Sequence, residues 1–128
     1  MYGRVILDHF SNPRNVGELD GPDAAGEASN PSDGDRVRLH LRIRKGRIED
    51  VRMRVMGCVA AIASASFFTE WIKGMEVREA LSISKEALAE RMGGLPEHKV
   101  RCSMTCVDAL AKAVSAADLP AESTRPSA

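Results

Sequence analysis

The chain has 128 residues, of which 44% are hydrophobic and 28% charged, as in one ordinary globular domain. Its 18 basic and 18 acidic residues balance, and aromatic residues make up only 4%, which argues against nucleic acid as a partner. No apolar run approaches the roughly 20 residues of a membrane span, and no secretory segment follows Met1. We therefore expect no membrane partner and a cytoplasmic protein with free or metal-bound thiols.

The first part of the chain predicts a short helix followed by a long loop. Residues 3–11 have the apolar spacing of a helix, which Asn12 and Pro13 would end. Residues 12–35 are rich in Gly, Pro, Asn and Asp, and long ordered loops in compact domains are usually functional.

Residues 36–56 alternate between apolar and basic side chains, which predicts an antiparallel hairpin with one buried face and a turn at residues 45–47. The inward set is Val37, Leu39, Leu41, Ile43, Val51, Met53 and Val55. We expect the first of these strands to lie under the helix that follows. The outward arginines are either a solvated face balanced by Glu49 and Asp50 or a surface that docks an acidic partner.

Helical patterns fill the rest of the chain. They cover residues 58–73, 76–81 and 84–92, the last with Ser84 as N-cap. A final helix is expected from Ser103, as N-cap, to about residue 118, with a core stripe of Met104, Val107, Ala111 and Val114. These elements predict an α+β fold: a small antiparallel sheet of about three strands packed on one face by helices. We expect a single domain over residues 1–120 and a frayed tail over 121–128.

Thiols and carboxylates from three separate segments indicate a metal or iron–sulfur site. Cys58 lies between a strand and a helix, and Cys102 lies beside Arg101 at a second helix start, so both thiols are expected to lean toward thiolate. Taken alone, Cys58 could instead be a buried structural cysteine. In the same way, Asp33 and Asp35 could supply oxygen ligands or only shape a turn.

The other candidate ligands are weaker. Cys106 follows Cys102 by four residues and is either core filler or a spare ligand. His9 is expected to pack, His40 to be solvated, and His98 is a minor candidate near Cys102. No histidine is evidently oriented on a thiol, so we do not expect an enzyme such as a cysteine hydrolase.

Several ordered motifs together resemble one family. They are residues 8–17 (DHFSNPRNVG), residues 30–35 (NPSDGD), Gly57-Cys58 with residues 61–64 (AIAS), residues 69–74 (TEWIKG), and residues 95–103 from Leu-Pro to Cys-Ser. Over about residues 1–118 the chain is similar to the iron–sulfur cluster assembly scaffolds of the IscU and NifU N-terminal type, with a SufE/NifU-like fold.

The resemblance implies a scaffold on which a [2Fe–2S] cluster is assembled from iron and from sulfur delivered by a cysteine desulfurase, then passed to acceptor apo-proteins. In this resemblance Cys58 and Cys102 match the second and third family cysteines, and Asp35 matches the aspartate. We therefore predict that Asp33, Asp35, Cys58 and Cys102, with Cys106 as a spare ligand, bind iron, the cluster, or zinc as the protein is isolated.

Two positions depart from the family pattern. Asp33 stands where the family has its first cysteine, and Arg101, which cannot ligate a metal, stands where many members have a histidine. The segment from Leu95 to Val100 lacks a second proline, which argues against handling by an Hsp70-type chaperone. The alternative is a diverged paralogue that binds zinc or mononuclear iron, or regulates a desulfurase, without building clusters.

Overall fold

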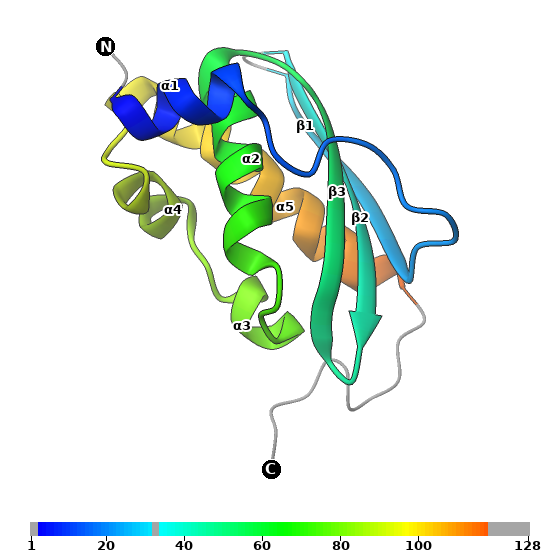
Figure 1. Cartoon of the computed structure of the whole chain (residues 1–128). Helices are drawn as coiled ribbons and strands as arrows, with labels where there is room; N and C mark the ends of the chain where they lie inside the picture. Colours follow the sequence, from blue (N-terminus) through cyan, green and yellow to red (C-terminus); the bar gives the residue numbers. More distant parts are fainter. Residues whose placement is uncertain (1–2, 32–33, 118–128) are drawn as a thin grey trace.

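The computed structural model of the chain describes residues 3–31 and 34–117. The elements are α1 (Arg4–Ser11), β1 (Ala24–Asn30), β2 (Asp35–Arg44), β3 (Arg47–Met56), α2 (Val59–Ile72), α3 (Val77–Leu81), α4 (Lys85–Arg91), the 3-10 helix η1 (Glu97–Lys99) and α5 (Val100–Ala116). The strands form an antiparallel sheet in the order β1-β2-β3, and the helices lie on one face of it (Figure 1). The predicted α+β fold is confirmed. The predicted tail, residues 121–128, lies outside the described residues.

The hairpin of β2 and β3 follows the alternation of its sequence. Val37, Leu39 and Leu41 are fully buried, whereas Ile43 is half-buried beside an irregularity in the strand pairing. The two turn residues, Lys45 and Gly46, have φ values of 53° and 76°, as in the tight turns that match the twist of a hairpin.

Strand β1 corrects the expectation of a loop over residues 12–35. All of β1 pairs with β2, although its sequence, AAGEASN, has no β-branched or aromatic residue. At Gly26 the lack of a side chain is required because α5 packs directly on this strand. A Cβ atom added to Gly26 would lie 2.6 Å from the carbonyl oxygen of Ala109.

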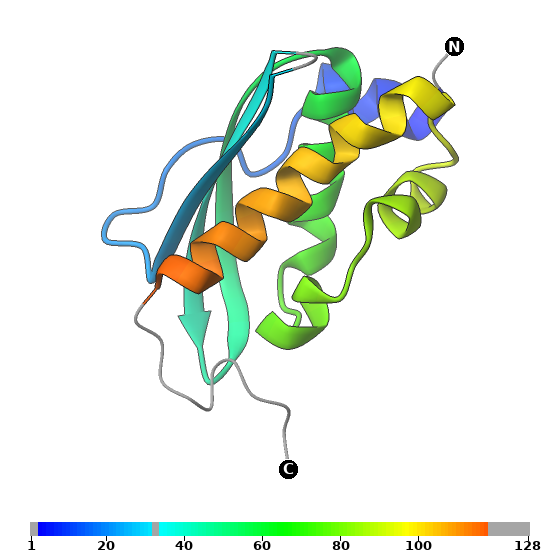
Figure 2. The ribbon, with the colours of Figure 1, turned by 180° about the vertical axis from the view of Figure 1, so that it is seen from behind.

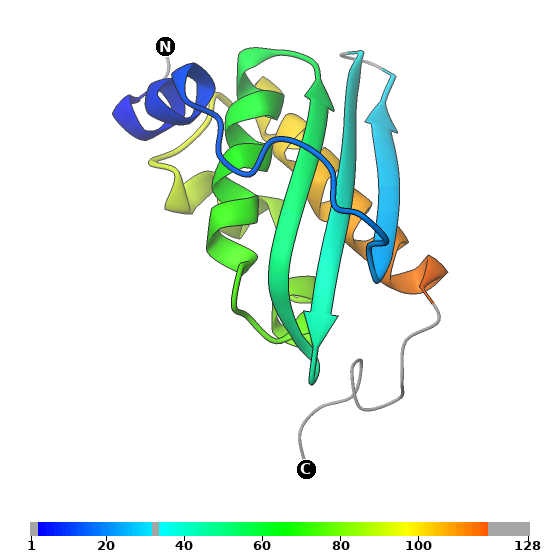
Figure 3. The same cartoon turned by 45° about the vertical axis from the view of Figure 1, so that its right-hand side comes forward.

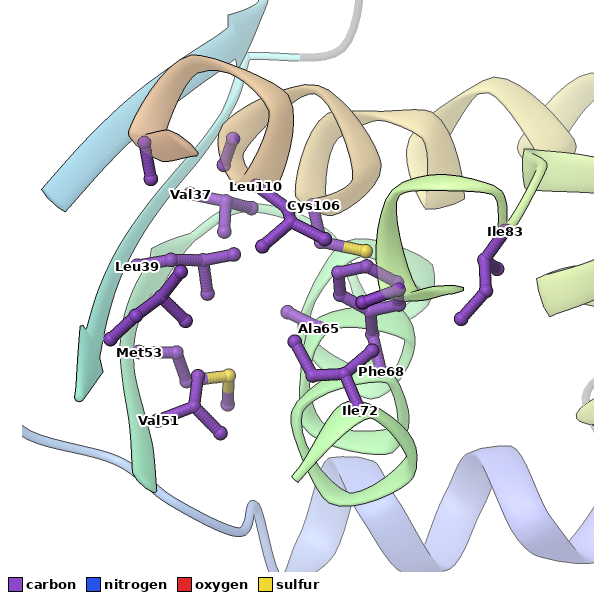
Figure 4. Close-up of a cluster of buried hydrophobic side chains, with 14 of the residues drawn as sticks. Val37, Leu39, Val51, Met53, Ala65, Phe68, Ile72, Ile83, Cys106 and Leu110 are labelled. Carbon is purple, nitrogen blue, oxygen red and sulfur yellow. The ribbon is translucent and has the colours of Figure 1, made fainter. Parts of the chain in front are cut away.

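Helix α5 covers β1 and β2, while α2 lies along β3 (Figure 2). The expectation that α2 would cover the apolar face of β2 was therefore wrong. The close approach of α5 to β1, which small side chains permit, places α5 over that half of the sheet. Between the two helices and the sheet lies the core, with Phe68 of α2 facing Leu110 and Cys106 of α5 (Figure 4).

The start of α5 differs from the prediction. The helix begins at Val100, directly after η1, and the Ser103 hydroxyl donates to the carbonyl of Val100 at 2.6 Å instead of capping the helix. The buried stripe is also shifted, because Met104 is 40% exposed and Ala111 is exposed. Val114 is buried as predicted, and Val107 is half-buried against the core. The other buried residues of this helix are Cys102, Ser103, Thr105, Cys106, Ala109, Leu110 and Ala113.

The shorter helices agree with their capping signals. The Ser84 hydroxyl accepts a hydrogen bond from the backbone N–H of Ala87 at 3.0 Å, as predicted for the N-cap of α4. Gly93 and Gly94 then end this region with φ values of 92° and 97°. Within residues 3–31 and 34–117, no helix has the length and apolar content needed to cross a membrane.

The face of the sheet opposite the helices is crossed by the chain between α1 and β1 (Figure 3). This segment first pairs with the edge of β3, where Met53 donates to the carbonyl of Asn15 at 2.7 Å. Farther along, the guanidinium group of Arg42 donates to the carbonyls of Asp20 and Gly21. The basic face is therefore partly covered by the chain itself.

Candidate metal centre

Three of the predicted ligands converge at the end of the sheet where β2 begins and β3 ends. Asp35 is the first residue of β2, Cys58 is the N-cap of α2, and Cys102 lies in the first turn of α5. One ligand atom from each residue lies within 4.8 Å of the other two. Cys58 is 23 positions from Asp35 and 44 positions from Cys102 in the chain, so the fold brings distant segments into one small cluster.

Asp35 is held in place by the start of α2. Its side chain is buried, and Oδ1 accepts a hydrogen bond from the backbone N–H of Cys58 at 3.1 Å. This bond satisfies a free N–H at the helix start, where the helix dipole also favours a carboxylate. Gly57 leaves room for the interaction, since a Cβ there would lie 2.5 Å from Oδ1. The second oxygen, Oδ2, lies 3.9 Å from the sulfur of Cys58.

The two thiols are adjacent but differ in exposure. The Sγ atoms of Cys58 and Cys102 are 3.6 Å apart, and Cys58 is half-buried whereas Cys102 is only 1% exposed. Ala60 and Ala61 pack against Cys102 in a small cluster of their own. Their short side chains let the start of α2 approach the start of α5.

The pKa of Cys102 is raised, chiefly because the thiol is buried and further because it faces Asp35 and Cys58. The expectation that this thiol leans toward thiolate was therefore wrong for the metal-free protein, because burial beside an anion outweighs the helix start. A bound cation would replace the thiol protons and reverse this balance, so metal binding here would release protons.

The spacing of the three groups fits a metal ion. Two sulfur ligands with metal–sulfur bonds of about 2.3 Å in tetrahedral geometry lie about 3.8 Å apart. The observed separation of 3.6 Å between the two sulfurs is close to that value. Two thiols and one carboxylate form a donor set that both zinc and iron accept.

Of the other candidate ligands, Cys106, His9 and His40 are not part of this cluster. Cys106 lies in the main hydrophobic core, where its thiol donates to the carbonyl of Ser103 at 3.2 Å and burial raises its pKa. Asp33 lies outside the described residues, and so do the side chains of His98 and Arg101. His9 is buried as expected. His40 was expected to be solvated, but it is half-buried and accepts a hydrogen bond from the backbone N–H of Leu19.

The N-terminal motif has a structural role that sequence reasoning missed. The Nδ1 atom of His9 lies 2.7 Å from the hydroxyl oxygen of Ser66, which also accepts the backbone N–H of Arg14 at 2.9 Å. The side chain of Asn15 donates to the hydroxyl of Thr69 at 3.1 Å. The signal was present in the sequence: Ser66 and Thr69 are polar residues three positions apart, and so on one face, of a mainly apolar helix. They fasten the N-terminal segment to the helix that carries Cys58.

Comparison with known proteins assigns the family. The family model described as the NifU-like N terminal domain matches residues 1–119. A protein of Archaeoglobus fulgidus named iron–sulfur cluster assembly scaffold protein IscU 1 is 44% identical over 114 residues, covering 89% of this chain and 74% of its own length. The IscU scaffold protein of Azotobacter vinelandii is 41% identical, covering 88% of this chain and 91% of its own length.

Solved structures show the same fold. An iron–sulfur cluster assembly scaffold protein for the SUF system from Fervidobacterium islandicum AW-1 superimposes with a TM-score of 0.74 at 21% identity, over 88% of this chain and 96% of that one. A NifU-like N-terminal structure from Brucella abortus gives a TM-score of 0.72, also at 21% identity, over 88% and 91% of the two chains. From its sequence relatives and its fold, the chain belongs to the family of the NifU-like N-terminal domain, to which IscU-type proteins also belong.

Proposed function

We propose that this protein is a scaffold for iron–sulfur cluster assembly, which receives sulfur from a cysteine desulfurase, binds iron or a [2Fe–2S] cluster, and passes the cluster to acceptor apo-proteins. The observation that carries the proposal is the convergence of Asp35, Cys58 and Cys102. It occurs in a chain whose relatives are named as assembly scaffolds and not as enzymes. A protein that binds a cluster without catalytic turnover agrees both with this group of residues and with the names of the relatives.

The two cysteines are suited to different tasks. Cys58 is half-buried and can meet the persulfide of a desulfurase, whereas Cys102 is buried and better placed as a ligand. In sulfur transfer, the Cys58 thiolate would attack the outer persulfide sulfur. A new sulfur–sulfur bond forms on Cys58, and the desulfurase thiolate leaves. Conversion of this sulfur to sulfide then requires two electrons from an external reductant.

The carboxylates would make the bound cluster easy to release. A carboxylate is a harder and weaker ligand for cluster iron than a thiolate. With Asp35 at the centre and Asp33 two residues before it, the chain offers two thiols and two carboxylates in these segments. Labile ligation suits a protein whose cargo must move on to another protein. Such thiols stay reduced in a cytoplasm, where we expect the protein to work.

Anaerobic reconstitution tests the proposal. The purified chain, supplied with ferrous iron and either sulfide or cysteine plus a desulfurase, is expected to develop the visible absorption of a [2Fe–2S] cluster. Alanine substitution of Cys58 or Cys102 should abolish this absorption, whereas Cys106→Ala serves as the control for loss of a thiol outside the centre. An apo-ferredoxin should then acquire the cluster.

The same experiment separates the scaffold from the paralogue alternative. A chain that binds one zinc or iron per molecule through Cys58 and Cys102, but never acquires sulfide, would contradict the scaffold proposal. The donor set alone fits either function, and the names of the relatives favour the scaffold.

A further inference from the structure

An open hollow of about 280 Å³ lies on the face of the sheet opposite the helices, beside the metal centre. Its lining consists of Val16, Glu27, Arg36, Arg38, Arg54, Val55 and Met56. In the strand pairing, Arg36 stands opposite Met56 and Arg38 stands opposite Arg54, so these four side chains share one face. The segment that crosses this face pairs with β3 at Met53, farther from the centre (Figure 3).

The hollow is basic. Arg38 pairs with Glu27 at 4.0 Å and Arg54 with Glu18 at 3.5 Å, and the side chains of all four are about half exposed. Such exposed ion pairs contribute little to the stability of the fold, so these arginines can pair with the acidic groups of a partner instead. Among the described residues, no ion pair joins Arg36 to an acidic side chain. Three guanidinium groups against two carboxylates leave one positive charge, and an anionic partner would relieve the repulsion between Arg38 and Arg54.

The hollow also carries two strongly exposed apolar side chains. Met56 is 69% exposed and Val16 is 54% exposed, the largest fractions among the exposed large hydrophobic residues. A methionine side chain is flexible and polarisable, and it adapts to the shape of an apolar partner group. Arginine and methionine are both enriched at protein–protein interfaces.

We infer that this hollow docks an acidic segment of a partner protein, with an apolar side chain of the segment against Met56 and Val16 and its carboxylates on Arg36, Arg38 and Arg54. Arg36 directly follows Asp35, and Met56 precedes Cys58 by two residues. A segment seated here would therefore place its parent protein beside the centre. Under the proposed function, on which this part rests, that protein is one that exchanges iron, sulfur or cluster with the scaffold.

Peptide titrations followed by backbone amide NMR signals test the inference on the complete chain. The probe is a synthetic peptide with one leucine flanked by Asp and Glu residues. Two matched peptides replace the acids by Lys, or the leucine by Ser, and inorganic phosphate serves as an anion without a chain. The acidic leucine peptide is expected to shift the amides of residues 36–38 and 54–56 and to bind more tightly than the three other probes.

Variants locate the contact. Arg38→Glu and Met56→Ser should each lower the affinity for the acidic peptide by at least about fivefold, which is the effect expected from losing one exposed charge or one apolar contact. Arg44→Glu is the matched control. It lies at the other end of β2 beside a second basic hollow lined by Arg44, Lys45 and Arg47, and it should leave binding unchanged. Amide spectra confirm that each variant is folded.

The inference is overturned if millimolar acidic peptide shifts none of these amides, if phosphate or the serine peptide produces the same shifts with the same affinity, or if Arg44→Glu weakens binding as much as Arg38→Glu. Chemical reconstitution with iron and sulfide needs no partner, so Arg38→Glu should still acquire a cluster. Peptide binding without reconstitution of the unmodified chain would sustain the docking surface and reject the scaffold function. Cluster reconstitution without peptide binding would support the scaffold function and reject the docking surface.

Discussion

Asp35 fixes the local geometry of the centre. One carboxylate oxygen accepts the Cys58 backbone N–H, Gly57 provides the space for it, and Oδ2 lies 3.9 Å from the Cys58 sulfur. At the scale of single residues, one hydrogen bond and one glycine thus fix the direction in which this carboxylate faces the two thiols.

Asp33 is the position where a single change should strengthen retention. If it occupies the place of a third sulfur ligand, Asp33→Cys should hold a reconstituted cluster longer in air and bind zinc more tightly at neutral pH, because thiolate is the softer ligand. Loss of visible absorption in air and competition with a zinc chelator measure the two effects. Asp20→Cys, which adds a thiol in the segment before β1, is the control. Equal retention by all three proteins would show that residue 33 does not face the metal.

The short distance between Cys58 and Cys102 predicts that they form a disulfide under oxidation. The sulfur atoms are 3.6 Å apart, so little movement is needed to form the bond. Diamide would take up the two thiol hydrogens, and the chain should lose the mass of two hydrogen atoms. Zinc should slow the reaction. Peptide mapping should find the pair 58–102 and leave Cys106 reduced, whereas a product that includes Cys106 or links two chains would contradict the geometry.

The proximity of Asp35, Cys58 and Cys102 was predictable, but the protonation of Cys102 was not. The residue types and the family resemblance pointed to these three positions, which lie close together in the structure. The raised pKa of Cys102 depends on its burial, which comes from packing of the start of α5 against Ala60 and Ala61 of α2. Packing of a helix start is a tertiary effect that local signals do not contain.

At the scale of elements, the alternating strands were predictable and the third strand was not. Hydrophobic alternation identified β2 and β3, because each has one face on the core. Strand β1 carries small residues whose reason lies in a helix more than 80 positions away, since Gly26 abuts Ala109 and Ala113. The residues of β1 are small because a helix packs closely on the strand, and small residues do not produce the apolar and polar alternation by which a strand is recognised in a sequence.

Leucine 41 tests the assignment of faces within β2. Leu41 is fully buried, whereas Arg42 points to the other face and donates to backbone carbonyls. Leu41→Ala should lower the free energy of unfolding by about 2–5 kcal/mol through lost burial and the cavity that remains. Arg42→Ala should lower it by much less. Urea denaturation of the two variants beside the unmodified chain provides the measurement, and equal losses would reject the assignment.

At the scale of the whole molecule, the N-terminal segment connects both faces of the fold. It starts from α1, is fastened to α2 through Ser66 and Thr69, and then crosses the outer face of the sheet to β1 (Figure 3). Because α2 carries Cys58 at its start, the same contacts hold the helix that orients the centre. The segment's polar side chains therefore belong to the support of the site, although they lie outside its ligand cluster.

His9 makes the stability of the whole fold depend on pH. Its pKa is lowered by burial and then by the charge of Arg14, which together outweigh the opposing effects of Glu70 and Asp8. The unfolded chain, with an ordinary histidine pKa near 6.5, then binds the proton more readily than the folded protein. The stabilisation from neutral His9 is complete above about pH 6.5 and declines as pH falls through that value toward the lower folded pKa.

Urea unfolding at pH 8 and pH 5 should therefore show a larger loss of stability for the unmodified chain than for His9→Gln, which cannot titrate. His40 and His98 are present in both proteins, so their contributions cancel in the comparison. An NMR titration of the His9 ring gives its folded pKa directly. A value at or above that of an exposed histidine, or equal pH slopes for the two proteins, would show that the contacts with Ser66 and Arg14 do not favour the neutral ring.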